Sequence, residues 1–402
     1  MTQLRLTTAG ESHGPGEVCL IEGIPAGMRL ETKDIDLDLA RRQQGYGRGG
    51  RMAIESDRAR LLAGVRLGRT LGTPIAILVE NRDHANWLRL MSPDVPAPSI
   101  DDEPWPRVTV PRPGHADLAG MIKYGHADVR DVLERASARE TVGRVAAGAV
   151  CKRMLSEFGV TVRGRVLSIG SIDTSCGDIT DPSAVDWGAV EESQVACADD
   201  VASAAMCAEI DRARAAGESL GGIFEIWCWG VCPGLGGYAA YDDRLDGRLL
   251  GALGSIPAIK GVEVGRAFAD SASLGSQVHD ATYVGEGAGG RWITRRTNRA
   301  GGLEGGMTNG MPIVLRAAMK PIPTLTTPLP AVDVDTLEAV YAHVERSDVT
   351  AVPAARVVGE AMVALVVAQA YREKFGGDSL EQMRAAIIGY EHEVEERGLW
   401  RR

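Results

Sequence analysis

The sequence predicts an α+β protein in which strands and long helices form separate layers. Two observations support this class: several short segments alternate apolar and polar residues like half-buried strands, and longer segments rich in small residues have helical spacing. The two kinds of segment cluster apart instead of alternating regularly, which argues against a doubly wound parallel sheet. Because the chain shows neither internal repeats nor a linker rich in proline and serine, we expect one large domain over 1–402, with two intimate domains as the alternative.

The expected elements follow in chain order. Strand-like runs predict strands at 4–8, 18–22, 75–79, 160–169, 222–229 and 312–318. Helical spacing predicts helices at 34–44, 116–124, the stretch after Ser137 up to Phe158, 201–216, 243–253, 353–375 and 380–390. The longest apolar run, 361–368, is too short to span a bilayer, so no membrane association is expected.

Composition excludes several classes of function. With 45% hydrophobic and 24% charged residues, the chain has enough apolar material for a large core and too little charge for a disordered protein. The 44 Lys and Arg against 54 Asp and Glu, with only 5% aromatic residues, argue against a nucleic-acid partner. The 49 glycines exceed the roughly 28 that average usage predicts, and they follow no collagen-like period.

The seven cysteines form an odd set without metal-type spacing, so no metal site is predicted. The closest pair, Cys228 and Cys232, lies in or beside a strand-like run and is expected in the packed core. The sequence starts at Met1 without a signal sequence, so the cytoplasm is the expected compartment.

Glycine-rich loops supply the candidate site residues. In the loop 9–16, glycines flank Ser12 and His13 between two apolar strands, and the loop is longer than a hairpin turn requires. Such a loop lets a ligand approach the backbone and leaves the imidazole in a cleft. A long surface turn with an incidental histidine is the alternative.

The loop 39–51 is rich in arginine. Residues 41–60 contain six arginines against two acidic residues, a local charge of +4 in an acidic chain. The dipole at a helix C-terminus explains Arg41, but Arg48 and Arg51 lie among glycines, where guanidinium groups can reach phosphate or carboxylate. An anion pocket is therefore the favoured interpretation.

The loop 111–117 places His115 just before a short predicted helix. A helix N-terminus attracts anions and disfavours the imidazolium form. This position favours a functional role for His115, and a satisfied structural histidine is the alternative.

The segment 134–140 contains a second predicted helix start. A single helix over 129–158 is one interpretation. Ser137 and Glu140 have the spacing of a capping box, so we favour a helix break at Ser137. The break puts Arg135 and Arg139 around an N-terminus suited to phosphate. An exposed, salt-bridged helix face is the alternative.

Two later loops resemble these. The loop 297–310 leads into a strand and then into the extended basic segment 319–324, and the loop 346–353 leads into the C-terminal helix. In that last loop, Asp348 beside Arg346 is either a site carboxylate or one half of an exposed ion pair.

One motif is rejected. The segment 285–290 matches G-x-G-x-x-G, but it is not followed by a helix with small packing residues. We expect the tip of a hairpin there and no dinucleotide site.

Together the loops provide two histidines, one carboxylate, several arginines and a lysine. The arginines indicate a substrate with several negative charges, and histidines donate or accept protons near neutral pH. No covalent nucleophile stands out. The residues alone therefore predict acid/base chemistry on a phosphorylated carboxylic acid, with or without an organic cofactor.

A series of segments through nearly the whole chain closely resembles the chorismate synthase family, and the segments occur in family order. They are GESHG at 10–14, GYGRG at 45–49, RPGHAD at 112–117, ERASARET at 134–141, AIKGVE at 258–263, NRAGGLEGG at 298–306, and the run from RSD at 346–348 to Pro353. Such a series is far more specific than any one motif.

The resemblance implies the last step of the shikimate pathway, in which 5-enolpyruvylshikimate 3-phosphate loses phosphate by a 1,4-trans elimination to give chorismate. It implies a need for reduced FMN without net redox change, with NADPH as a candidate reductant. It also implies a β-α-β sandwich of antiparallel sheets around a helical core, assembled as a homotetramer. A non-catalytic protein that binds flavin or anions is the alternative.

The resemblance also implies roles for individual residues. His13 would protonate the leaving phosphate, His115 would protonate or polarise the reduced flavin, and Asp348 would assist removal of the C6 proton through flavin N5. The implied substrate contacts are Ser12, Arg42, Arg48, Arg51, Arg112, Ser137, Arg139 and Arg346. The implied flavin contacts are Arg135, Ala136, Ser137, Pro257, Ala258, Gly305, Lys320, Pro321, Ile322, Pro323, Thr324 and Arg346.

Two positions depart from the family pattern. Arg356 stands where the family more often has glycine, and Pro257 stands where asparagine or glutamine is more usual. Neither departure touches the implied acid/base residues.

Overall fold

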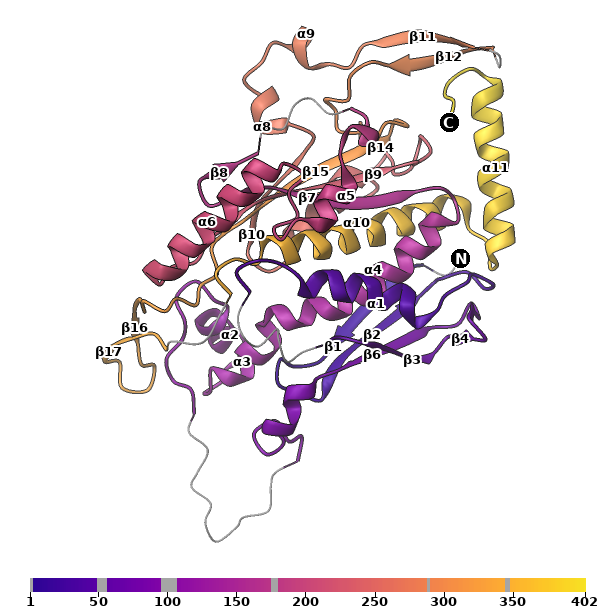
Figure 1. The fold of residues 1–402 in the computed structure, drawn as a ribbon. Coiled ribbons are helices and arrows are strands. Elements are labelled where there is room, and N and C mark those ends of the chain that lie inside the picture. The colour runs from indigo at the N-terminus through magenta and orange to yellow at the C-terminus, as the bar shows by residue number, and fades with distance from the viewer. Residues whose placement is uncertain (1–2, 49–55, 95–106, 175–179, 288–289, 344–347) are drawn as a thin grey trace.

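Two antiparallel sheets enclose a layer of long helices (Figure 1). The computed structural model describes residues 3–48, 56–94, 107–174, 180–287, 290–343 and 348–402. The first sheet has the order β1-β2-β6-β3, with bounds Arg5–Ala9, Gly16–Glu22, Ile75–Glu80 and Ala59–Ala63. The second has the order β10-β15-β9-β7-β8, with bounds Ile259–Val264, Ile313–Met319, Gly222–Trp229, Thr161–Ile169 and Ile172–Asp173. This architecture confirms the α+β class and the sandwich.

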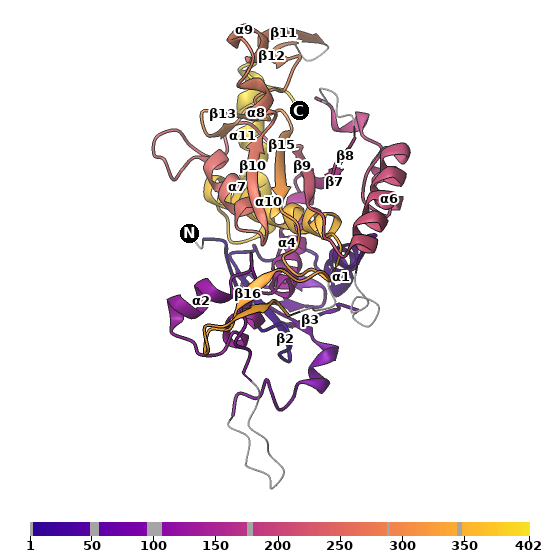
Figure 2. The same ribbon diagram turned by 90° about the vertical axis from the view of Figure 1, so that its left-hand side faces the viewer.

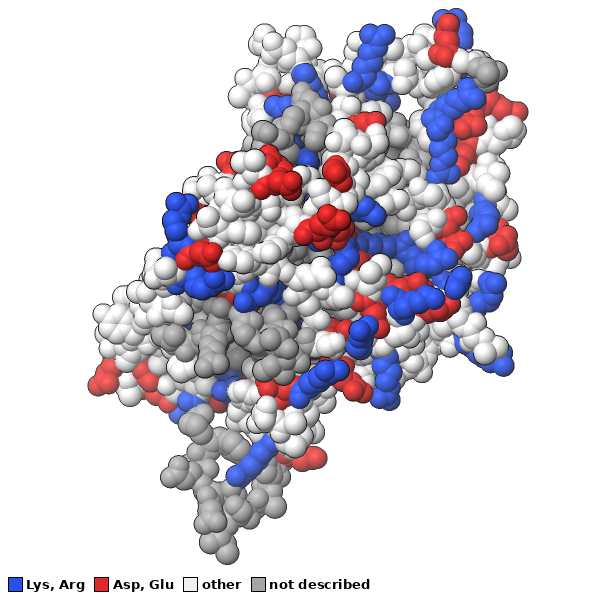
Figure 3. Space-filling view, in the orientation of Figure 1, with Lys and Arg blue, Asp and Glu red and all other residues white. Residues whose placement is uncertain are grey.

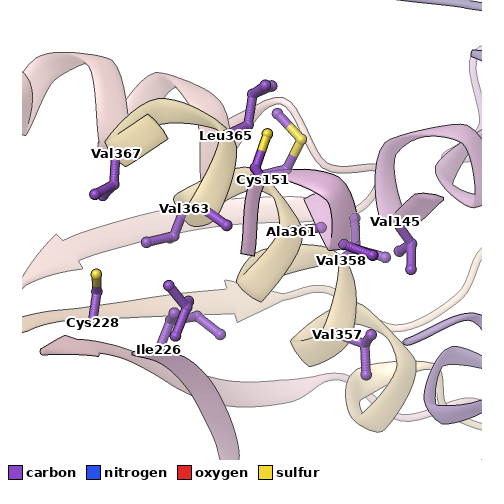
Figure 4. Close-up of a cluster of buried hydrophobic side chains, with 14 of the residues drawn as sticks. Val145, Cys151, Ile226, Cys228, Val357, Val358, Ala361, Val363, Leu365 and Val367 are labelled. Carbon is purple, nitrogen blue, oxygen red and sulfur yellow. The ribbon is translucent and has the colours of Figure 1, made fainter. Parts of the chain in front are cut away.

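The helical layer consists mainly of α1 (Thr32–Gln43), α4 (Thr141–Ser156) and α10 (Val352–Phe375). Helix α4 packs on the first sheet and α10 on strands β7 and β9 of the second, and the two helices pack against each other (Figure 4). Their crossing is close, because a Cβ added to Gly148 would lie only 2.2 Å from the Cβ of Ala361. Glycine at this position is therefore a packing requirement.

Helix α10 is the centre of the main hydrophobic core. Among the described residues it alone is long and apolar enough to cross a membrane, and 94% of its most apolar window is buried inside the protein. Its apolar surface is thus accounted for by contacts with α4 and the second sheet, which Figure 4 shows around Val358, Ala361 and Val363.

Shorter elements surround this sandwich. The β11–β12 hairpin lies at one end of the molecule, far from α2 and β16, in both views (Figures 1 and 2). The remaining bounds are β4 Val65–Arg66, β5 Arg69–Thr70, η2 Arg82–Asn86, α2 Asp117–Tyr124, α3 Arg130–Ala136, η3 Ala138–Glu140, η4 Pro182–Ala184, α5 Trp187–Glu192, α6 Asp200–Ala216, α7 Leu245–Gly254, α8 Ala267–Asp270, α9 Gly275–Val278, β11 Thr282–Gly287, β12 Gly290–Arg295, β13 Leu303–Glu304, β14 Met307–Thr308, β16 Pro330–Val332, β17 Ala339–Tyr341 and α11 Leu380–Glu396.

All six predicted strands are present, as β1, β2, β6, β7, β9 and β15, with ends shifted by at most two residues. The seven predicted helices are also present, although α11 extends six residues beyond its predicted end. The elements absent from the predicted set include β3, β8, β10, α3 and α5. In β10 the glycine at 261 hides the strand pattern, and the register of its pairing with β15 shifts between Ile259 and Gly261.

The predicted helix break at Ser137 is confirmed, but the capping box is wrong. Helix α3 ends at Ala136, and the Ser137 side chain accepts a hydrogen bond from the Arg139 backbone N–H, which caps the short 3₁₀ turn η3. The Glu140 carboxylate accepts instead from Arg144 Nε, one turn into α4, at 3.1 Å.

Two smaller predictions are confirmed. The segment 285–290 belongs to a hairpin, in which Gly287 of β11 pairs with Gly290 of β12. Cys228 and Cys232 are buried in the core, and burial raises the pKa of Cys232 to about 11, so this thiol stays protonated at neutral pH.

Candidate active site

The loop 9–16 is fastened to helix α3. The Ser12 backbone N–H donates to the Glu134 carbonyl at 2.9 Å, and Arg135 donates to the Gly10 carbonyl at 3.1 Å. From the other side, the Asn81 side-chain amide donates to the carbonyls of Ser12 and Gly14 at 2.9 and 3.0 Å. The loop is therefore held by backbone contacts on both sides.

His13 is oriented by a buried carboxylate. Its Nδ1 lies 2.9 Å from both carboxylate oxygens of Glu134, whose side chain is 4% exposed, and its backbone N–H donates to the same group. Arg130 pairs with Glu134 at 3.1 Å, and the Trp87 ring lies 4.0 Å from the imidazole, centroid to centroid. Burial opposes ionisation of Glu134, but the hydrogen bonds from His13 more than offset it and lower the pKa of this carboxyl. The ionised carboxylate fixes an Nδ1–H tautomer and directs Nε2 away from Glu134.

His115 has an equivalent partner. Its Nδ1 lies 2.5 Å from the Asp117 carboxylate, which is fully buried and also accepts from the Arg112 side chain and backbone at 2.9 and 3.0 Å. Burial opposes ionisation of Asp117, but His115 and Arg112 hold the pKa of this carboxyl well below its usual range. His115 precedes α2, as predicted, but the dipole is not its main electrostatic partner, because a carboxylate contacts the ring directly.

Arg42 and Arg139 converge on one buried counter-ion. Asp57 lies 2.7 Å from an Arg139 Nη and 3.5 Å from an Arg42 Nη. Arg42 also donates to Thr141 Oγ1 at 3.0 Å and to the Ala138 carbonyl at 2.9 Å. Two predicted substrate arginines thus meet beside the η3 turn that Ser137 caps.

Asp348 pairs with Arg48 at 3.2 Å, and both side chains are largely buried. Their loops are also joined by a hydrogen bond from the Val349 N–H to the Gly47 carbonyl at 2.8 Å. Arg346 and Arg51 lie outside the described residues. The structure therefore does not test the exposed Arg346–Asp348 pair considered from the sequence.

The segment 319–324 is joined to two other predicted flavin contacts. The Lys320 backbone N–H donates to the Ala258 carbonyl at 3.0 Å, and its Nζ donates to the Gly114 carbonyl at 2.5 Å, next to His115. The Ser219 hydroxyl donates a hydrogen bond to the Ile322 carbonyl at 2.6 Å. The contact between Ala258 and Lys320 uses the Ala258 carbonyl, so it does not depend on which side chain stands at Pro257.

These residues fit a phosphorylated flavin. Arg135 and Lys320 provide cationic donors for a phosphate. A Cβ at Gly114 would lie 3.4 Å from Lys320 Nζ, so glycine keeps the approach to that amine open. Ala258 has φ +68°, which holds the 257–258 backbone in a tight turn against Lys320.

One predicted flavin contact lies apart from the others. Gly305 is in the turn between β13 and β14, before the end of β15 where Ile313 pairs with Cys228. Lys320 follows the other end of that strand, where Met319 pairs with Gly222. The structure does not bring Gly305 next to Lys320.

The sequence predictions missed the counter-ions. Glu134 and Asp117 lie inside the quoted motifs, and the spacing HxD at 115–117 was a usable signal for the second of them. The sequence analysis counted Asp57 only as one of the two acidic residues in 41–60 and gave it no role in the site. Trp87 and Asn81 carried no signal, because their role depends on a contact between segments about 70 residues apart.

Blue and red atoms are interspersed over the face drawn in Figure 3. Within the site, Arg42 and Arg139 are paired with the buried Asp57, and Arg48 with Asp348. A separate hollow of about 40 Å³ on the second sheet is lined by Arg165, Glu225 and Arg316 among others. Both arginines donate to Glu225 at 2.8–3.0 Å, which indicates a structural ion network.

Among the described residues no group of three or more His, Cys, Asp or Glu side chains could hold a metal ion.

Comparisons with known proteins agree on one family. The family model for chorismate synthase matches residues 4–371. The chain is 55% identical over 393 residues to a chorismate synthase of Rubrobacter xylanophilus, covering 98% of this chain and 97% of the relative. It is 53% identical over 380 residues to that of Desulforudis audaxviator, covering 94% and 95%. A crystal structure of chorismate synthase superimposes with a TM-score of 0.79 at 40% identity, covering 98% of this chain and 99% of that one. The chain therefore belongs to the chorismate synthase family, which uses reduced FMN to convert 5-enolpyruvylshikimate 3-phosphate to chorismate in the shikimate pathway.

Proposed function

We propose that His13, His115 and Asp348 carry out the proton transfers of this phosphate-lyase reaction. The observation that carries the proposal is that both histidines, in glycine-rich loops far apart in sequence, contact a buried carboxylate through Nδ1, at 2.9 and 2.5 Å. A carboxylate on Nδ1 leaves Nε2 as the nitrogen that exchanges a proton with a ligand.

His13 donates the Nε2 proton to the departing phosphate. Glu134 stabilises the protonated imidazole before the transfer, and Trp87 restricts the tilt of the ring. The neutral imidazole that remains keeps its hydrogen bond to Glu134, so the ring stays in place for reprotonation.

We assign His115 to the flavin, because it follows Gly114, whose carbonyl accepts a hydrogen bond from Lys320. Reduced FMN, when bound, supplies electron density transiently, without net redox change. His115 provides a proton or a polarising N–H toward it through Nε2, while Asp117 and Arg112 fix the ring. Asp348, oriented by Arg48, assists removal of the substrate proton.

The arginines hold the phosphate and two carboxylates of the substrate. In this assignment Arg42 and Arg139 act beside Ser137, and Asp57 balances their charge. The remaining substrate contacts are Ser12, Arg48, Arg51, Arg112 and Arg346. The proposed flavin contacts are Arg135, Ala136, Ser137, Pro257, Ala258, Gly305, Lys320, Pro321, Ile322, Pro323, Thr324 and Arg346.

Phosphate release tests the assignment. With chemically reduced FMN under anaerobic conditions, the protein should release phosphate from 5-enolpyruvylshikimate 3-phosphate, and His13→Ala or His115→Ala should slow this by about 10²-fold or more. His126→Ala is the control, since the His126 side chain is 37% exposed and contacts Asp131 and the Tyr124 ring, neither of which is a predicted site residue. Wild-type rates in either site variant would remove that residue from the mechanism.

We also propose NADPH as the reductant of the flavin, on the strength of the family resemblance. Anaerobic turnover with NADPH and oxidised FMN, with no added reductase, tests whether the chain reduces its own flavin. Turnover only with pre-reduced FMN would assign the reduction to another protein.

We propose a homotetramer of single-domain chains, 1–402, in the cytoplasm. The β11–β12 hairpin supports an assembly, because it projects from the body with Val284 58% and Ile293 42% exposed. Light scattering should give four times the chain mass, and Val284→Glu should reduce it. A monomeric wild type would contradict the proposal.

A further inference from the structure

Glu17 is a carboxyl group buried beneath the candidate site. It is the second residue of β2, its side chain is 1% exposed, and it lies directly behind the loop that carries Ser12 and His13. A Cβ at Gly10 would lie 2.6 Å from its Oε2, so the carboxyl group touches the loop backbone. The mechanism above gives this residue no role.

The hydrogen bonds of Glu17 are incomplete. Its Oε2 lies 3.4 Å from an Arg135 Nη, a long distance for an ion pair, and among the described residues no group donates to its Oε1. Arg135 is shared with neutral acceptors, namely the Gly10 carbonyl and the Thr8 carbonyl and hydroxyl, at 2.8–3.1 Å. A buried carboxylate with one weak contact is poorly stabilised in its charged form.

Charges of both signs face Glu17. Arg135 on α3 and Arg139 on η3 favour the ionised carboxyl, whereas Glu140 on η3 and Glu11 in the loop disfavour it. Burial is the largest influence, and with these charges it raises the pKa of Glu17 to about 7. Because this value is near neutrality, a change in the charge of one neighbour changes the protonation of Glu17.

We propose that Glu17 takes up a proton when an anion binds at Arg135. The inference rests on the proposed placement of Arg135 at the flavin. An arriving phosphate and the Glu17 carboxylate repel each other across one guanidinium, and a proton from the solvent removes that repulsion. Anion binding at this site is therefore coupled to proton uptake, and its affinity decreases as the pH rises through 7.

Calorimetry of oxidised FMN binding tests this coupling. Titrations at pH 7 in buffers of different ionisation enthalpy give the number of protons taken up. Wild type should take up more than Glu17→Gln, by up to about half a proton, because a group with a pKa near 7 is about half protonated at pH 7. Protonation of the FMN phosphate contributes equally to both proteins and cancels in the difference.

Glu22→Gln is the matched control, because it removes a carboxylate from the same strand, β2, without touching Arg135. It should behave like wild type. Equal proton uptake by wild type and Glu17→Gln would overturn the inference. Turnover measured alongside separates the two proposals: inactive protein that keeps the proton difference contradicts only the proposed function.

Should Glu17→Gln fail to fold, infrared difference spectra of wild type provide the test. At pH 7, FMN binding should add a carbonyl band of a protonated carboxyl group, and Glu17→Asp should shift that band. Absence of a new band in wild type would overturn the inference.

Discussion

Each histidine of the site is paired with a carboxylate that an arginine also contacts. Arg130 contacts Glu134 and Arg112 contacts Asp117, so each carboxylate stays ionised despite burial. The two pairs differ in surroundings: His13 has Trp87 on its ring face, whereas the His115 loop is tied to Lys320 through Gly114. The proposed function assigns the two histidines to different ligands, His13 to the phosphate and His115 to the flavin.

Glu134→Gln should lower kcat by about 10²-fold while KM stays within about twofold. The amide can still accept the Nδ1 hydrogen bond, but it cannot balance the charge of a protonated His13. Single-turnover phosphate release measures the effect. Asp131→Asn, an exposed residue on the same helix, is the control and should keep the wild-type rate.

Glu17 should make the folded protein less stable as the pH rises. Its folded pKa of about 7 lies above the ordinary value of 4.5, so the folded state holds the proton more tightly, and stability is lost between pH 4.5 and 7. The loss is at most about 3 kcal/mol, the product of the shift and 1.36 kcal/mol per pH unit. Urea unfolding at pH 5 and pH 8 should show this loss in wild type and a smaller one in Glu17→Gln; equal losses would contradict it.

The sequence was informative about charged site residues and uninformative about their partners. Arg48 stood out because it lies among glycines, and Arg139 because it lies at a predicted helix start. Arg42 was indicated only by the family resemblance. Asp57 and Glu134 did not stand out in the sequence. Their contacts with Arg139 and His13 form only because the fold brings distant segments together.

Among the elements, those with a long apolar pattern were predictable. Helix α10 and strand β9 carry enough apolar residues to define their type and bounds. Helix α3 was missed because it has seven residues, no side-chain cap and an alternating set of charges. It nevertheless supplies both Glu134 and Arg135, so the shortest elements carry much of the site.

Gly148→Val should destabilise the protein by about 1–3 kcal/mol, because the added side chain would force α4 away from Ala361 of α10. Chemical unfolding measures the change. Gly251→Ala on α7 is the control, since a Cβ there meets nothing within 4 Å. That substitution should be neutral or slightly stabilising, because alanine favours helix more than glycine does. An equal change in stability in both variants would contradict the packing requirement at Gly148.

Across the whole molecule, one buried carboxylate joins the layers of the sandwich. Glu360 of α10 accepts from Arg41 of α1 at 2.7 and 2.8 Å, from Lys152 of α4 at 2.5 Å and from the Gly164 N–H of β7 at 2.9 Å. Arg356, one of the two departures from the family pattern, belongs to this network and also contacts Glu191. Burial opposes ionisation of Glu360, but Lys152 and Arg41 hold its pKa well below the usual range.

Glu360→Gln should cost about 3–5 kcal/mol of stability, because it leaves buried cations without their counter-ion. Glu373→Gln on the same helix, where the carboxylate pairs with Arg248 at the surface, should cost about 1 kcal/mol or less. Since the folded pKa of Glu360 is lowered, its contribution is present above pH 4.5 and is lost as the pH falls. Denaturant unfolding at pH 7 and pH 4 measures both effects, and equal costs in the two variants would contradict this role.

The contact between Trp87 and His13 has a spectroscopic consequence. A protonated imidazole in contact with an excited indole quenches its emission, whereas a neutral imidazole does so much less. Subtracting the emission of a Trp87→Phe variant from that of wild type therefore isolates a signal that follows the charge of His13. The site contains its own optical reporter, readable without substrate, cofactor or label.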